Sequence, residues 1–128
     1  MYDPQQELYT RLYLDLKATG YDVYDGVLPP PKTPYPFIYL GDFRQADTDT
    51  KTQTIGTVFP KIHVWHSRTD QRGTVSQMLL AVKRVCRSIE RTEHFKWNCK
   101  NMVQNIFTDK STNAPLLHGV IDIDFTFS

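Results

Sequence analysis

The chain has 128 residues, of which 15 are basic, 14 are acidic and 40% are hydrophobic. This length fits one domain with one core, and the balanced charge lacks the basic excess typical of nucleic-acid binding. No apolar run approaches the ~20 residues that span a bilayer, and the N-terminus has no signal-peptide pattern. With only two cysteines, the sequence predicts a single cytoplasmic domain over residues 1–128 with free thiols.

The first third of the chain predicts a helix, a short strand and a connector. Asp3 and Pro4 are typical of a helix start, apolar residues follow at helical spacing, and Gly20 fits the position after the helix end. Residues 21–26 are a short, uncertain edge strand. Five of the eight prolines then follow in residues 28–36, which predict an extended surface connector.

A polar segment separates the next two strand candidates. Residues 37–43 are rich in aromatic and β-branched side chains. Residues 53–67 form a longer candidate that Gly56 and Pro60 interrupt. Pro60 cannot donate a hydrogen bond to a neighbouring strand, so it predicts an edge position or a bulge. Residues 44–52 are polar and lack periodicity, which predicts a loop or hairpin tip of nine residues, longer than the usual two to five.

The second half predicts one long helix and two strands. Thr69 or Asp70 can cap a helix whose apolar face runs from Val75 to Ile89. Residues 102–110 and 119–127 are strand candidates, and the last alternates most sharply. The order α-β-β-β-α-β-β predicts an α+β domain: a mostly antiparallel sheet of four or five strands with two main helices on one face.

Two of the four histidines, His63 and His66, lie three residues apart. On a helix this spacing would bring both to one metal ion. The alternation from Lys61 onward instead predicts a strand, where an odd offset places the two side chains on opposite faces. His94 and His118 fall in predicted loops, so no metal site is expected.

The last strand carries Asp122 and Asp124 on one face, about 6.5–7 Å apart at the backbone. One interpretation is a pair of catalytic carboxylates, as in glycoside hydrolysis. A second is the solvated face of an amphipathic strand, which the common alternating pattern favours. A third is an acidic lining that faces a lumen.

An enzyme has no positive support in the sequence. No phosphate-binding loop, zinc motif or nucleophile elbow occurs, and Cys86 falls on the apolar face of the second helix as an inert thiol. No cofactor is therefore expected. Tyrosines beside turns and prolines, together with long loops, favour protein–protein contact instead.

The order of several short motifs resembles a tail completion family of long-tailed bacteriophages, whose members act as tail terminators or tail-to-head joining proteins. The match spans nearly the whole chain and rests on order and spacing. The residues that carry it are Tyr35, Pro36, Phe37, Gly41, Asp42, Val64, Trp65, Ser67, the segment from Gly73 to Val85, and the final strand.

This resemblance implies a small α+β subunit that assembles into a ring, commonly a hexamer, without enzyme activity or cofactor. The ring would cap the tail tube, end its polymerisation and offer a joining surface to the head connector. It would lie at the head-proximal end of the virion tail after assembly in the host cytoplasm. DNA would pass through the lumen without specific recognition. The alternatives are a small enzyme with an Asp122/Asp124 site and an adaptor that binds a peptide along a strand edge.

Three sets of residues have expected roles within such a ring. Asp122 and Asp124 are candidates for the lumen lining, and Tyr35, Trp65 and Arg68 are candidates for contact between subunits. The polar segment is a candidate contact with the tail tube or the connector. Its residues are Arg44, Gln45, Asp47, Asp49 and Lys51.

Overall fold

The computed structural model describes residues 2–26, 29–50 and 52–128. Two helices and five strands follow one another in the order α1 (Pro4–Ala18), β1 (Val23–Asp25), β2 (Phe37–Asp49), β3 (Thr54–His66), α2 (Arg72–Ser88), β4 (Trp97–Asp109) and β5 (Leu116–Phe127). This confirms the predicted α+β class and the order of its elements. In the described part of the chain, neither helix is long and apolar enough to cross a membrane.

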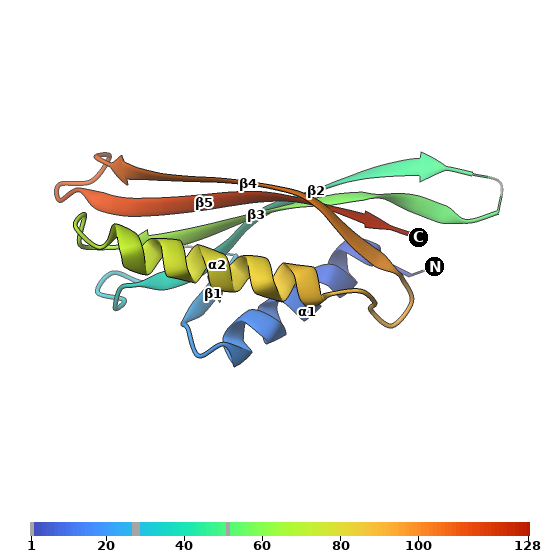
Figure 1. The fold of residues 1–128 in the computed structure, drawn as a ribbon, viewed down its shortest axis with the longest axis horizontal. Coiled ribbons are helices and arrows are strands. Elements are labelled where there is room, and N and C mark those ends of the chain that lie inside the picture. The colour runs from blue at the N-terminus through green and yellow to red at the C-terminus, as the bar shows by residue number, and fades with distance from the viewer. Residues whose placement is uncertain (1, 27–28, 51) are drawn as a thin grey trace.

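The strands form one sheet in the order β1-β2-β3-β5-β4. The short strand β1 is parallel to β2, and all other neighbours are antiparallel. Both helices lie on the same side of the sheet, as Figure 1 shows. Helix α1 packs near β1 and β2, and α2 packs on β3, β4 and β5. The other face of the sheet has no helix in the described structure.

The core lies between the helices and the sheet because each element presents one apolar face. Leu8, Leu12 and Leu16 recur at helical spacing in α1 and are fully buried. Ile121 and Ile123 recur at strand spacing in β5 and are also fully buried. Burial of each such side chain contributes about 1.5–3 kcal/mol, so these two periodicities fix which face of each element turns inward.

The two helices begin differently. The Asp3 side chain accepts a hydrogen bond from the Gln6 backbone N–H at 3.2 Å, which confirms the predicted start of α1. The predicted caps of α2 are wrong. Helix α2 begins at Arg72 after Gln71, which makes no capping hydrogen bond, and the Asp70 carboxylate instead pairs with Arg68 at 2.9 Å.

The prediction of a nine-residue loop or hairpin tip over residues 44–52 is right about a hairpin but wrong about its extent. Strand β2 continues through it to Asp49, which pairs with Thr54. Hydrogen bonding to β3 outweighs the low strand propensity of the polar residues, because strand propensity depends strongly on the neighbouring strand. We call residues 44–49 and 54–57 of this hairpin the arm. The arm projects past the helices (Figure 1). Lys51 lies outside the described residues.

Pro60 lies in a central strand, at a local irregularity. The register of β2 shifts between Leu40 and Phe43, and Phe43 is the partner of Pro60. A proline has no N–H to donate, so it is tolerated where pairing is already disturbed. Of the two predicted explanations, the bulge is confirmed and the edge position is wrong.

Strands β4 and β5 both begin earlier than predicted. Trp97 opens β4 and is buried, with its ring packed on Phe125 and Phe127 at centroid distances of 6.1 and 5.5 Å. This aromatic packing extends the pairing of β4 with β5 into residues 97–101, whose polar side chains gave no strand pattern in the sequence. His118, which was predicted to lie in a loop, therefore lies in β5, and Cys99, which precedes the predicted strand over residues 102–110, lies in β4.

Candidate functional site

The face of the sheet opposite the helices is the main candidate surface. We call it the open face. Lys61, His63 and Trp65 of β3 lie on it, because Ile62, Val64 and His66 of the same strand turn toward the helices. The register places their neighbours from β5 beside them, with Trp65 opposite His118 and Lys61 opposite Asp122. Polar and aromatic side chains thus share one uncovered surface.

The predicted split of His63 and His66 is confirmed, but His63 has a partner that the sequence did not indicate. His63 Nδ1 lies 2.8 Å from His118 Nε2, across the β3–β5 pair. The His118 ring stacks on Trp65, with centroids 3.6 Å apart, and meets Phe107 edge-on at 4.8 Å. His66 lies on the helix side, where its Nδ1 accepts a hydrogen bond from the Arg68 backbone at 3.0 Å.

The two stacked imidazoles are held in the neutral form at pH 7. Burial lowers the pKa of His118 to about 4, and the charge of His63 adds to this shift. Burial also lowers the pKa of His63, with a smaller effect from Lys61. His118 Nδ1 is buried without a hydrogen-bond partner in the described structure. A buried N–H without a partner is costly, which favours the tautomer in which His118 Nε2–H donates a hydrogen bond to His63 Nδ1.

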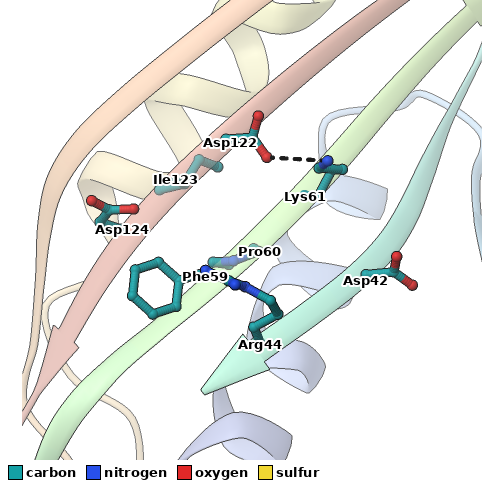
Figure 2. Close-up of a pocket in the computed structure, with 8 residues that line it drawn as sticks. All are labelled: Asp42, Arg44, Phe59, Pro60, Lys61, Asp122, Ile123 and Asp124. Carbon is teal, nitrogen blue, oxygen red and sulfur yellow. Dashed lines mark ion pairs between the residues drawn. The ribbon is translucent and has the colours of Figure 1, made fainter. Parts of the chain in front are cut away.

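Asp122 and Asp124 share the open face, as predicted, but bind different partners. Asp122 pairs with Lys61 of β3 at 3.8 Å, and 56% of its side chain is exposed. Asp124 accepts a hydrogen bond from Asn101 Nδ2 of β4 at 3.1 Å. Figure 2 shows both carboxylates on β5, with Asp122 beside Lys61 and Asp124 farther along the strand. Their separate partners match a solvated amphipathic strand more closely than a carboxylate pair acting on one bond.

These carboxylates border a polar basin of ≈ 480 Å³. Asp42 and Arg44 of β2 close its far side, and the Arg44 guanidinium lies 5.0 Å from the centroid of the Phe59 ring. Charges of both signs meet in this basin, so it has no single-sign field to hold an anion or a cation.

The expected subunit-contact residues lie in two places. Tyr35 and Trp65 line one groove of ≈ 280 Å³ together with Phe37 and Leu116. Tyr35 is 39% exposed, and its ring packs on Phe37 at 5.1 Å. Arg68 does not line this groove and pairs with Asp70 instead. The structure therefore joins two of the three predicted residues.

The described residues offer no metal centre of three or more ligands. Within residues 2–26, 29–50 and 52–128, no three His, Cys, Asp or Glu side chains come together in a suitable cluster. Cys86 is buried, and burial raises the pKa of its thiol, which makes it a poor nucleophile.

The sequence matches no protein-family model and no curated protein. Its fold, however, is similar to that of a chain in the solved structure of the virion of a native gene transfer agent particle, with a TM-score of 0.65. The two chains are 19% identical, and the similarity covers 97% of this chain and 93% of the other. The two chains therefore share a whole-domain α+β fold.

Proposed function

We propose that this chain is a structural subunit of a phage-like virion without enzyme activity, and that it terminates the tail. The observation that carries the proposal is the whole-length fold similarity to a chain of a gene transfer agent virion. The motif order around Tyr35, Trp65 and the α2 helix supports the more specific role through its resemblance to tail completion proteins. In that role the chain lies at the head-proximal end of the tail.

A tail terminator of this size acts as a ring of identical copies. A cyclic ring needs a heterologous contact, in which two different patches of each subunit meet. We propose six copies, as the resemblance implies, that assemble on the end of the tail tube. Tyr35, Trp65 and Arg68 are candidates for contacts within the ring.

The open face is the proposed lining of the ring's lumen. It is the uncovered side of a long sheet, and it carries Asp122 and Asp124 near the middle of β5. Carboxylates repel the phosphates of DNA, so such a lining would let DNA pass without binding it. Specific recognition of DNA is not part of this role.

The arm is the proposed contact with the tail tube or the head connector. Arg44, Gln45 and Asp47 are exposed, and Asp49 and Lys51 belong to the same proposed contact. A two-stranded ribbon without cover is marginally stable in water, so a projecting arm of this kind favours a role in docking. Pairing to β3 gives it a defined direction before it meets a partner.

Shortening the arm tests this proposal. Residues 46–57 are removed and Gln45 is joined to Val58, its partner in β3, by a two-residue Asn-Gly turn, which suits a hairpin. The body should fold, as circular dichroism can show, while tails made with this variant should lack rings in electron micrographs. Normally capped tails would contradict a docking role for the arm.

A further inference from the structure

Although the net charge of the chain is near zero, acidic and basic residues are unevenly distributed along the sequence. Residues 1–50 contain eight acidic and four basic residues, which gives −4. Residues 51–128 contain eleven basic and six acidic residues, which gives +5. Part of this separation is lateral, because β1 and β2 of the first half lie at one end of the strand order and β4 of the second half lies at the other.

The acidic side consists of α1, β1 and β2. Asp22 precedes β1, Asp25 ends it, and Asp42 lies in β2; all three are exposed. Asp47 of the arm is exposed on the same side. None of these four carboxylates takes part in an ion pair within the described part of the chain. Their charge is therefore available to a partner.

The basic side consists of the C-terminal half of α2, the segment after it and the start of β4. Its exposed basic residues are Arg84, Arg87, Arg91, Lys96 and Lys100. Only Glu90 and Glu93 oppose them over the same stretch, and none of the five forms an ion pair among the residues that the structure describes. Lys100 of this basic side lies on β4, at the opposite end of the strand order from β1 and β2. Arg91 instead adjoins α1, because the Arg11 side chain donates a hydrogen bond to the Arg91 backbone oxygen at 3.0 Å.

Each side also has a free strand edge. Strand β1 covers β2 only from Ile38 to Leu40, so in the described structure residues 41–49 have no strand on their outer side. On the far side of the sheet, β4 pairs only with β5 and exposes Val103 and Phe107. Uncovered edges of this length are normally protected or paired. Because β2 and β4 run in opposite directions, addition of one to the other would be antiparallel, the commoner arrangement.

We infer that the occupant of the basic side is the acidic side of a second copy of this chain, so that copies associate head-to-tail through opposite charges along the two sheet edges. This inference rests on the proposed function and adds the surfaces that close the ring. The two patches differ, as a heterologous contact requires. Exposed charges are screened by salt, so the contact is weak in solution and becomes stable when a tail end gathers several copies.

Two charge-reversal variants test the contact. The acidic-side variant carries Asp22→Lys and Asp42→Lys, and the basic-side variant carries Arg84→Glu and Arg87→Glu. Each alone should reduce the fraction of tails bearing a ring at least tenfold in electron micrographs. A control for the acidic-side variant with the same change of +4, Asp122→Lys with Asp124→Lys on the open face, should cap tails normally. A control for the basic-side variant with the same change of −4, Arg72→Glu with Lys110→Glu at the other ends of α2 and β4, should also cap tails normally.

Mixing the two variants separates head-to-tail association from other arrangements. The intact basic side of one variant can still meet the intact acidic side of the other, and the two reversed sides are also complementary to each other. Chemical cross-linking of the mixture should therefore trap a heterodimer, whereas neither variant alone should form a cross-linked homodimer. If the wild-type protein forms rings and both variants cap tails as often as wild type does, the inference is wrong and the proposed function stands. Absence of rings with wild-type protein would instead contradict the proposed function. If the basic-side variant caps tails but loses affinity for double-stranded DNA, the basic side serves DNA, and the inference is wrong.

Discussion

At the scale of single residues, the His118 imidazole is buried between the rings of Trp65 and Phe107, and its pKa is lowered. The alternation of β3 sufficed to place His63 and His66 on opposite faces. It could not reveal the His63–His118 bond, because the two residues are 55 positions apart and meet only through the β3–β5 register. A short strand pattern predicts which way a side chain points, whereas its cross-strand partner depends on how separate segments align.

The buried imidazole makes stability depend on pH. The unfolded His118 binds a proton below its ordinary pKa of 6.5, but the folded residue does so only near pH 4. The unfolded state therefore holds more protons between these values, and stability should fall by about 1–3 kcal/mol as pH drops from 6.5 to 4. Urea unfolding of wild type and His118→Phe across this range measures it. The variant should show a flatter dependence, and an unchanged slope would contradict the assignment.

A second residue-scale link joins α1 to the segment between α2 and β4. One carboxylate oxygen of Glu7 accepts hydrogen bonds from Thr92 Oγ1 at 2.8 Å and from the His94 N–H at 3.0 Å. The other lies 2.7 Å from His94 Nδ1. Burial acts to raise the pKa of Glu7, but these hydrogen bonds outweigh it and leave the pKa below its ordinary value of 4.5.

Glu7→Ala should lower the free energy of unfolding by about 1–3 kcal/mol at pH 7, because it removes charge-assisted hydrogen bonds. Gln6→Ala is the matched control, since that exposed side chain bonds only to Thr10, and it should change stability by less than about 0.5 kcal/mol. The effect of Glu7→Ala should shrink as pH falls below 4.5, where the folded carboxylate becomes protonated. Equal losses in both variants would show that the network contributes nothing.

At the scale of elements, the arm is the clearest departure from the sequence prediction. Residues 44–52 lack the alternation that marks a half-buried strand because the β2 side of the arm is exposed on both faces from Arg44 to Thr48. Apolar and polar residues alternate in a strand when one of its faces is buried, so a strand that is exposed on both faces shows no such alternation. The apolar faces of the helices and of β5 were predicted correctly because each presents one face to the core, whereas the start of α2 and the start of β5 were not.

Gly56 allows the two strands of the arm to approach closely. A Cβ at this position would meet the Ala46 carbonyl oxygen and lie 2.8 Å from Phe127 Cζ. Gly56→Ala should therefore destabilise the protein by about 1–3 kcal/mol. Gly73→Ala is a control of opposite sign: this helical position has nothing within 4 Å of the new Cβ, and alanine should stabilise α2 by about 0.5–1 kcal/mol. Thermal unfolding of both variants checks the pair.

At the scale of the whole molecule, the fold separates three surfaces. The helices cover one face of the sheet, the open face carries Asp122 and Asp124, and the two lateral sides carry opposite charge. The order of helices and strands in the sequence predicted the α+β fold, but the charge separation could be placed in space only once the strand order was known. Net charge alone conceals it.

The proposed lumen lining predicts a defect after assembly. Virions in which Asp122→Lys and Asp124→Lys replace the wild-type chain should form with normal tails, because neither residue lies on a lateral side. They should release DNA more slowly, since positive side chains would attract phosphates along the passage. Time courses of DNA release triggered in vitro measure the effect, and raised salt should reduce it. Release at the wild-type rate would argue against lumen-facing positions.

The central claim is that this chain ends tail growth and prepares the tail for the head. The most direct measurement is electron microscopy of tails produced with and without the chain in an otherwise complete phage-like system. The account predicts tails of uniform length with a ring at one end when the chain is present, and overlong or headless tails when it is absent. Tails of normal length that join heads normally without the chain would contradict it.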